Sequence, residues 1–447
     1  MQIAIGLIGI LIGIVMLNWL SFKGWNMAYI AIVCAIIVAI LNVMNPQAAY
    51  VESFMAGAAN ILTMTYPVLL TGSLFAGVFS LSGAAVTIAR ALLKLFAKKG
   101  VQGNRGCWVV SIVSIVFFVL MLLGGVDGMA VQVAILPVII SLMKECNMTR
   151  KGIPLLLMAG YSAGAVPFAP HMLNTIPMTI LGTESGAFAI PGIVAGIAGL
   201  VICIFYSGNY FIRMKKRGEN FQSMPNDPNS DEDMERPNVL LSLLPLVVIF
   251  LLFNLAKLQI SICLLIGTAF VIPLYWKWIR LAAGSERPIE ALKSQLNKAV
   301  GTSGSVALSI CAVVGFAAVI QQTDVFNMIA GAMVGDGSGS IFMVALIVAV
   351  CAGITANSIA GLQVSLAVMA EKFMAAGVSA AALHRVASAA AQTLDSLPTS
   401  AGVVMAHQIS GVKLKDGYLP VAVVSIVIPA IRTLILCIFY LIYPGWV

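Results

Sequence analysis

The sequence has very little charge. Only 9% of its 447 residues are Asp, Glu, Lys or Arg, whereas soluble domains carry about 25%. Hydrophobic residues make up 60% of the chain, and its mean hydropathy is +1.02. A soluble fold of this length cannot bury so much apolar surface. The sequence therefore predicts an all-α polytopic membrane protein with lipid as its solvent.

Other classes of protein are disfavoured by motifs that the chain lacks. The eight cysteines are scattered singly without a CxxC pair, so neither a disulfide framework nor a zinc site is predicted. We expect no metal site and no cofactor. The net charge of +8 does not indicate nucleic acid, because the basic residues form short clusters between apolar runs, as in the cytoplasmic loops of membrane proteins.

Eight apolar runs are candidates for membrane spans of about 20 residues. They are 2–20, 27–43, 61–82, 187–212, 239–256, 258–275, 302–322 and 419–442. The first lacks a basic start and a cleavage site, so we interpret it as a retained helix rather than a signal peptide. Glycines spaced along two runs, at 6, 9 and 13 and at 192, 196 and 199, predict close helix packing.

Four further apolar stretches are interrupted by polar or helix-breaking residues. Stretch 107–143 breaks at 124–128, 153–182 at 167–171, 340–374 at 355–358, and 380–410 at 393–400. Basic clusters flank 107–143 on both sides, which predicts a re-entrant hairpin that starts and ends in the cytoplasm. We expect 340–374 to form a second hairpin, and the other two stretches to cross the membrane as broken helices.

This reading gives about ten transmembrane helices, two re-entrant hairpins and both termini outside. It places all but four of the 25 Lys and Arg in the cytoplasm, the exceptions being Lys257, Lys372, Arg385 and Arg432. The polar segment 213–238 carries Pro225, Pro228 and the acidic run 231–233. Such composition predicts a flexible cytoplasmic linker between an N-terminal repeat, 1–212, and a C-terminal repeat, 239–447.

The two repeats share one pattern. The hairpin tips at Asp127 and Asn357 are 230 residues apart, and the breaks at Pro167 and Pro398 are 231 apart. One hairpin would enter from the cytoplasm and the other from outside, so the repeats are predicted to be inverted. Inverted repeats with discontinuous helices are typical of secondary transporters, whose sites lie at the membrane midplane between the repeats.

The breaks are the predicted binding site. Irregular backbone within a membrane persists only where it faces protein or a watery cavity, and a broken helix exposes N–H groups that attract anions. These features favour a small anionic, hydroxylated substrate. The candidate ligands are Gly125, Asp127, Gly128, Pro167, Ala169, Pro170, His171, Asn174, Thr355, Asn357, Ser358, Ser396, Thr399 and Ser400.

Three titratable groups at the breaks are candidates for ion coupling: Asp127, Asp395 and His171. Asp395 is alternatively a structural cap, and His171 a fixed hydrogen-bonded side chain. We interpret Arg432, in the last span, as a structural partner of an acid in the second half. His384 and Arg385 are expected to be architectural.

At these breaks the chain resembles the gluconate:proton symporter family, part of a wider superfamily of ion-coupled transporters. LHRVAS at Leu383–Ser388 and LDSLP at Leu394–Pro398 are similar to that family's signature. In the first half, Pro167, Pro170, Asn174 and Pro177, followed by Leu181-Gly182-Thr183, match the spacing of its other motif. The pattern is nearest to the hydroxybutyrate permease branch.

The resemblance implies proton-driven uptake of a small organic acid, and a homodimer in a bacterial cytoplasmic membrane. The chain departs from the family pattern at Phe168-Ala169, His171, Thr399-Ser400 and Asp127, so the family's substrates transfer poorly.

The sequence therefore predicts a secondary active transporter that imports a gluconate-like or hydroxybutyrate-like acid with a proton. A sodium-coupled carboxylate or amino-acid transporter of the same fold is the alternative. An intramembrane enzyme is a remote one, because the sequence lacks HExxH.

Overall fold

The computed structural model describes residues 2–96, 103–123, 128–169, 171–225, 227, 235–256, 258–284, 287–326, 328 and 340–443. Within these residues the chain is helical and forms no strand, which confirms the predicted fold class. The helices of the first half are α1 (Gln2–Phe22), α2 (Met27–Leu41), α3 (Pro46–Ala48), α4 (Met55–Leu81), α5 (Ala84–Phe96), α6 (Asn104–Leu123), α7 (Gly128–Glu145), α8 (Ile153–Ala159), α9 (Met172–Leu181) and α10 (Ala189–Lys216).

The second half continues with a similar set of helices. They are α11 (Val239–Asn254), α12 (Ile260–Leu274), α13 (Trp276–Ala283), α14 (Pro288–Gln321), α16 (Ile341–Thr355), α17 (Ser358–Ala375), α18 (Ala380–Ala391), α19 (Ala401–Ser410), α20 (Leu414–Ala422) and α21 (Ile428–Ile442). Short π-helical segments, Ala49–Phe54 and Val423–Val427, join α3 to α4 and α20 to α21.

Local chemistry sets several helix starts. Asn26, Asn238, Asn357 and Ser379 precede α2, α11, α17 and α18, and each side chain accepts a hydrogen bond from an N–H of the first turn. These N–H groups have no partner inside the helix, so a side-chain acceptor stabilises the start.

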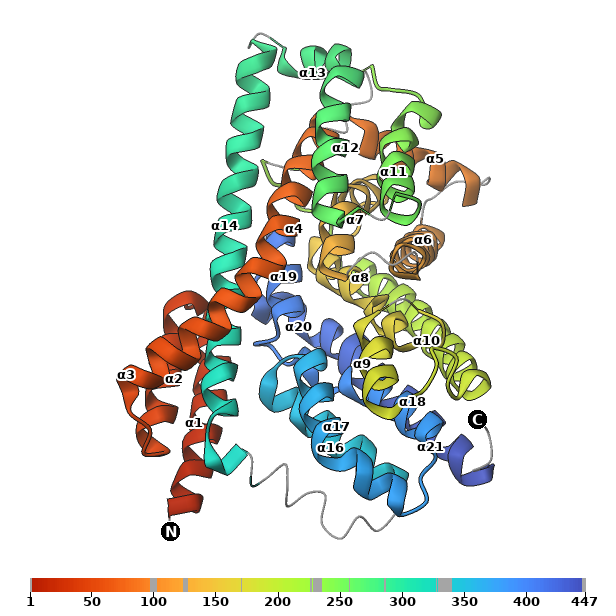
Figure 1. Ribbon diagram of the computed structural model, residues 1–447. Helices are drawn as coiled ribbons and strands as arrows, with labels where there is room; N and C mark the ends of the chain where they lie inside the picture. Colours follow the sequence, from red (N-terminus) through yellow and green to blue (C-terminus); the bar gives the residue numbers. More distant parts are fainter. Residues whose placement is uncertain are drawn as a thin grey trace.

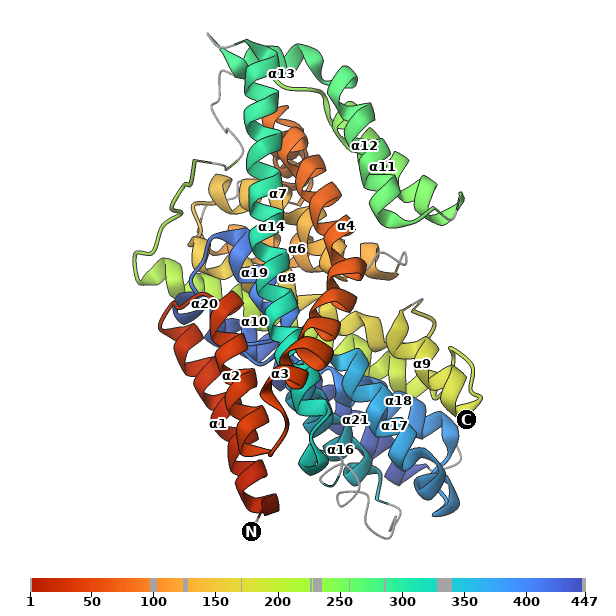
Figure 2. The ribbon, with the colours of Figure 1, turned by 60° about the vertical axis from the view of Figure 1, so that its left-hand side comes forward.

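Helices α4 and α14 are both long, with 27 and 34 residues. Helices α4 and α14 pack along each other in opposite directions (Figures 1 and 2). The α1–α2 pair lies against one end of α14, and the α11–α12 pair lies against α4 and α5 near the other end. The interrupted segments gather on one side of these helices, where α9 packs on α17 and α18, and α8 packs on α19 (Figure 1).

Three of the four predicted interruptions occur in described residues, and residues 124–127 of the other lie outside them. Helix α6 ends at Leu123 and α7 begins at Gly128, while α8 and α9 are separated by residues 160–171. Only two residues separate α16 from α17, and residues 392–400 separate α18 from α19. In both broken helices a 3-10 turn precedes the proline, at Tyr161–Ala165 and at Leu394–Ser396. The two breaks therefore share one local order, a 3-10 turn followed by a proline.

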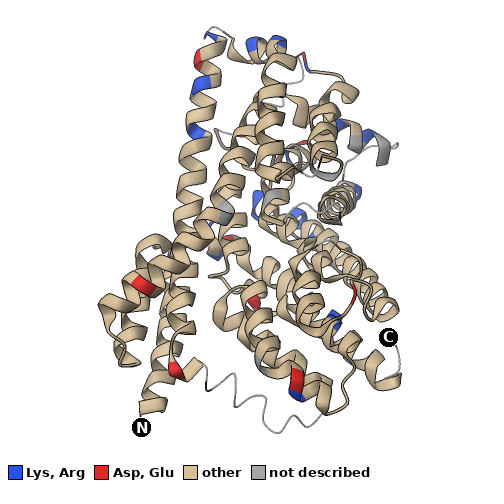
Figure 3. Cartoon of the chain, viewed as in Figure 1, with Lys and Arg blue, Asp and Glu red and all other residues tan. Residues whose placement is uncertain are grey.

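Several described helices are long and apolar enough to cross a membrane. There are five of them, or seven if each of two bent helix pairs counts as one span. The chain is therefore a polytopic membrane protein, while the count of ten spans and the inversion of the repeats remain predictions. Lys and Arg gather around α13, the start of α14 and α5 (Figure 3).

The predicted glycine packing is confirmed. A Cβ on Gly9 would lie 2.6 Å from the Leu41 side chain, and one on Gly13 would lie 2.5 Å from Val38. On α10, Gly192 faces Pro167, Gly196 faces Val166 and Gly199 faces Arg432, each closer than a real Cβ could approach. Helix α10 thus packs directly on the first break and on α21.

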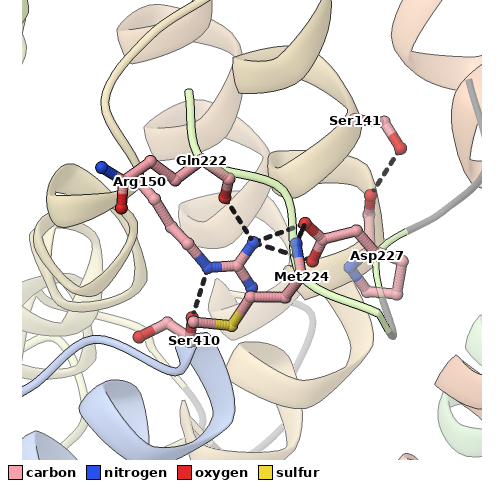
Figure 4. Close-up of polar contacts among 7 residues, drawn as sticks. Ser141, Arg150, Gln222, Met224, Asp227 and Ser410 are labelled. Atoms are coloured by element: carbon pink, nitrogen blue, oxygen red, sulfur yellow. Dashed lines mark hydrogen bonds and ion pairs between the residues drawn. The ribbon is translucent and has the colours of Figure 1, made fainter. Parts of the chain in front are cut away.

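Part of the linker packs on the helices. Residues 219–225 and 227 lie across the ends of α7, α8 and α19, and we call these residues the strap. Arg150 donates from Nη1 to the Asp227 carboxylate at 2.6 Å and from Nε to the Ser410 carbonyl at 2.8 Å (Figure 4). The strap also bonds Asn147, Thr149 and Lys151 through Glu219, Asn220 and Phe221. The strap therefore makes specific contacts, and the flexibility of 213–238 stays a prediction.

Candidate functional site

The first break lies between α8 and α9. Val166 is extended, and Phe168 has a left-handed backbone (φ 64°) and an exposed side chain. The ring nitrogen Nδ1 of His171 accepts a hydrogen bond from the Leu173 N–H at 3.3 Å, so His171 is the N-cap of α9. The chain thus leaves the α-helical path after α8 and returns to it at α9.

The second break lies between α18 and α19. Its 3-10 turn, Leu394–Ser396, is followed by Pro398, Thr399 and Ser400. Ser400 is the N-cap of α19, but its side chain makes no capping hydrogen bond. The N–H groups of the first turn of α19 therefore lack the side-chain acceptor that α17 and α9 have, which favours an anion there.

The tip of the α16–α17 hairpin packs against this second break. Ala356 has a left-handed backbone (φ 48°), and the Asn357 side chain caps α17 by accepting from the Ile359 and Ala360 N–H groups. A Cβ on Gly353 would lie 2.9 Å from Leu394. The hairpin can approach the break so closely only because this residue lacks a side chain.

Asp395 is the carboxylate at this junction. It is 5% exposed and accepts hydrogen bonds from Ser396 Oγ, at 2.9 Å, and from the Ser358 hydroxyl. The Tyr418 hydroxyl donates to the neighbouring Ser396 carbonyl at 3.2 Å. No described Lys, Arg or His forms an ion pair with Asp395. A buried carboxylate bonded only by neutral donors is a group that can exchange a proton.

The two breaks are joined across the halves. Gln392, just before the second break, donates to the Tyr161 carbonyl at the first, at 3.0 Å. Gln132 of α7 donates to the sulfur of Met158 at the end of α8, at 3.2 Å. The oxygens of Gln132 and Gln392 are buried without a partner among the described residues.

The predicted residues fall into two groups. Thr355, Asn357, Ser358, Asp395, Ser396, Thr399 and Ser400 come together at the second break and the α16–α17 tip, and Pro167, Ala169, His171 and Asn174 come together at the first break. Gly128 lies against the Tyr161 ring. Gly125, Asp127 and Pro170 lie outside the described residues.

Internal hydrogen bonds engage several of these side chains. Asn174 donates to the Val166 and Ala169 carbonyls and accepts from Arg385 at 2.6 Å. Thr355 donates within its own turn. Both side chains therefore hold the local backbone of the breaks through hydrogen bonds to its carbonyl groups.

The partner of Arg432 differs from the expected acid of the second half. Its Nη1 donates to the Ser162 carbonyl of the first half at 2.6 Å, and no described acid of the second half pairs with it. The sequence offered no sign of this, because an arginine in an apolar run indicates a buried partner without saying which.

Other polar residues at the breaks were not predicted. Gln132, Gln392 and Tyr418 each bond directly beside a break. Gln132 lies inside α7 and Gln392 is the C-cap of α18, and an uncharged amide in an apolar stretch is itself a signal that could have found them.

The spacing Gly160-Tyr161-Ser162-Ala163-Gly164 matches the G-x-S-x-G of serine hydrolases. That motif acts at a strand-to-helix turn, whereas Ser162 lies in a 3-10 turn between two helices. Nor do the described residues hold any group of three or more His, Cys, Asp or Glu side chains that could bind a metal ion.

Comparison with known proteins agrees with this architecture. A family model described as "GntP family permease" matches residues 5–442. The chain is also 21% identical to the "Uncharacterized transporter YxjC" of Bacillus subtilis (strain 168) over 470 residues, which cover 94% of this chain and 96% of that protein.

Proposed function

Because the chain belongs to the GntP permease family and is a transporter rather than an enzyme, we propose that it imports a small hydroxylated organic acid together with a proton. Gluconate-like and hydroxybutyrate-like acids are the substrate class. The LHRVAS and LDSLP motifs indicate the same family from the sequence alone.

One observation carries the proposal: an acid, several hydroxyls and an uncapped helix start meet at one point. Asp395, Ser358, Ser396, Thr399 and Ser400 are all buried and come from the α16–α17 tip and the second break. The start of α19 supplies partial positive charge for a carboxylate. The hydroxyl groups of these side chains can donate hydrogen bonds to the hydroxyl groups of the substrate and accept hydrogen bonds from them.

We assign proton coupling to Asp395. Protonation of this carboxyl removes a negative charge from the place where an anion would bind, so binding of proton and anion favour each other. His171 and Asp127 are the further candidates. If Asp395 served only as a structural cap, its neutralisation would leave coupling intact.

Sodium is the second candidate ion. The backbone carbonyls exposed at the second break, with Asn357, Ser358 and Asp395, offer the oxygen ligands that sodium requires. Uptake that proceeds at its full rate without sodium would exclude this candidate.

The remaining features of the proposal concern the membrane. We place the chain in a bacterial cytoplasmic membrane as a homodimer, with both termini outside and the Lys- and Arg-rich end in the cytoplasm. We also propose that α6–α7 and α16–α17 are re-entrant hairpins of two inverted repeats.

A thermal-shift screen of hydroxy acids on purified protein tests the substrate class. We expect a short hydroxylated monocarboxylate to raise the melting temperature, and the uncharged amide of the same acid to have no effect. If no acid of a broad panel stabilises the protein, or the amides stabilise it equally, the proposed substrate class is wrong.

A further inference from the structure

Helix α18 carries a stripe of buried polar side chains on one face. His384, Ser388 and Gln392 are spaced four residues apart, and Arg385 lies beside the first of them. All four are almost completely buried. Burying a polar side chain costs free energy unless it forms a hydrogen bond. Each of these side chains therefore requires a hydrogen-bond partner.

The Arg385 guanidinium supplies the most hydrogen bonds in this stripe. Its Nη1 donates to the Ala165 carbonyl at 2.9 Å and to the Asn174 amide oxygen at 2.6 Å. Its Nη2 donates to the Ser185 carbonyl at 2.9 Å, and its Nε donates to the Ala187 carbonyl at 3.1 Å. All four acceptors belong to the first half of the chain, about 200 residues away.

Other members of the stripe bond the same region. The Thr183 hydroxyl lies 2.8 Å from His384 Nδ1, and Ser388 donates to the Leu173 carbonyl at 2.6 Å. Gln392 donates to the Tyr161 carbonyl. The stripe thus contacts three segments of the first half: the 3-10 turn before Pro167, helix α9, and the loop that follows α9.

These partners explain how the first break survives in an apolar environment. Unwinding between α8 and α9 frees carbonyl groups that a continuous helix would satisfy, and each would be costly if left without a donor. Arg385 supplies donors in a fixed planar fork and makes no ion pair with a described carboxylate. Gly192 leaves room for both Arg385 and the ring of Pro167.

We propose that Arg385 is a positioning residue of the transport site. It fixes the geometry of the first break from the opposite half of the chain without itself contacting the substrate. Through Asn174, which donates to the Val166 and Ala169 carbonyls, the guanidinium sets the turn that leads into His171 and α9. This inference rests on the proposed function, since the first break must contribute to the substrate site.

Arg385→Lys tests the proposal, because lysine keeps the charge and loses the fork. Arg90→Lys is the control, because Arg90 pairs with Glu145 between α5 and α7, away from both breaks, and lysine can keep that pair. We expect Arg385→Lys to raise the substrate KM at least about 10-fold with Vmax changed less, as for a misplaced site, and Arg90→Lys to stay within about 2-fold.

A substrate-free measurement separates this proposal from the proposed function. Hydrogen exchange of the amides of 166–175 should be at least about 10-fold faster in Arg385→Lys, with 401–410 unchanged as an internal reference. Wild-type KM and unchanged exchange in Arg385→Lys would overturn the positioning role. Failure of the wild type to bind any acid would count against the proposed function alone, because the exchange comparison needs no ligand.

Asn174→Asp supports the test if Arg385→Lys does not fold. Aspartate keeps an acceptor for Arg385 but cannot donate to the Val166 and Ala169 carbonyls. The proposal expects faster exchange at 166–171 and a raised KM in this variant too. Wild-type values for both would contradict it.

Discussion

Asp395 accepts a hydrogen bond from Ser358, so the acid of the second broken helix is bonded to the first residue of α17. The two residues are contributed by separate interrupted segments, and both are 5% exposed. Any change in the charge of Asp395 is therefore felt at the α16–α17 tip as well as at the start of α19. This contact links the proposed proton site to the proposed substrate site.

Asp395→Asn should abolish accumulation driven by a pH gradient. The amide keeps the size and can still accept from Ser358, but it cannot take up a proton. Exchange of labelled for unlabelled acid across proteoliposomes, which needs no net proton movement, should persist at a measurable rate. Asp416→Asn, at an exposed position in α20, is the control and should accumulate substrate normally. Retained accumulation in Asp395→Asn would reduce Asp395 to a structural cap.

The ion pair between Arg150 and Asp227 should contribute strongly to stability. Its side chains are 8% and 4% exposed, so removing the carboxylate leaves a buried guanidinium unpaired (Figure 4). We expect Asp227→Ala to lower the free energy of unfolding by about 3–5 kcal/mol.

The exposed pair of Lys277 and Glu235 is the matched control for Asp227→Ala. These side chains are 61% and 58% exposed, and Glu235→Ala should cost about 0–1 kcal/mol. Melting temperatures of the two variants in detergent provide the comparison. Equal decreases in melting temperature would show that the ion pair between the strap and Arg150 does not specifically stabilise the fold.

The contact of the strap with the ends of α7 and α8 should depend on acid pH. Partial burial raises the pKa of Glu219, but hydrogen bonds from Thr149 and Lys151 and the charges of Lys151 and Arg217 outweigh it, so the pKa lies below its usual value. A lowered carboxyl pKa adds stability that is complete above the unfolded-state pKa and is lost as pH falls through the folded one.

The backbone amides of 219–225 should therefore be equally protected from hydrogen exchange, relative to their intrinsic rates, at all pH values from 5 to 8. Their protection should fall only below about pH 4. Helix α10 serves as the reference for any loss of protection that is not specific to the strap. Glu219→Gln should remove the part of the loss of protection at 219–225 that exceeds the loss at α10. Protection that falls between pH 7 and 5 would point to a different group.

Gly361→Ala should destabilise the α16–α17 hairpin. A Cβ at this position would lie 2.3 Å from the Cα and 2.5 Å from the backbone nitrogen of Ala352, and neither atom can move without shifting α16. We expect a cost of about 1–3 kcal/mol or more, as for overpacking. Gly304→Ala in α14 has nothing within 4 Å and should be neutral or stabilising by about 0.5–1 kcal/mol. Thermal melting of both variants makes the comparison.

The sequence predicted the breaks well because their signals are local. Proline, glycine or aspartate in an apolar run is visible over a few residues, as at Pro167 and Asp395. Which stretches break, and roughly where, could therefore be read directly.

What the breaks bond to could not be predicted, because the partners are distant in sequence. Arg385 meets acceptors about 200 residues away, and Arg150 meets Asp227 across 77 residues. The composition of 213–238 predicts flexibility, and it gave no sign of the buried ion pair between Arg150 and Asp227 of the strap. The residues at the α6–α7 tip, Gly125 and Asp127 among them, remain predicted site residues only.

Uptake of a labelled hydroxy acid into sodium-free proteoliposomes under an imposed inward proton gradient tests the central claim most directly. The acid should be one that stabilises the protein in the thermal-shift screen. We predict accumulation above the equilibrium level, collapse of that accumulation when a protonophore is added, and no effect of sodium. Uptake that only reaches equilibrium, or accumulation that appears only with a sodium gradient, would contradict a proton-coupled organic acid transporter.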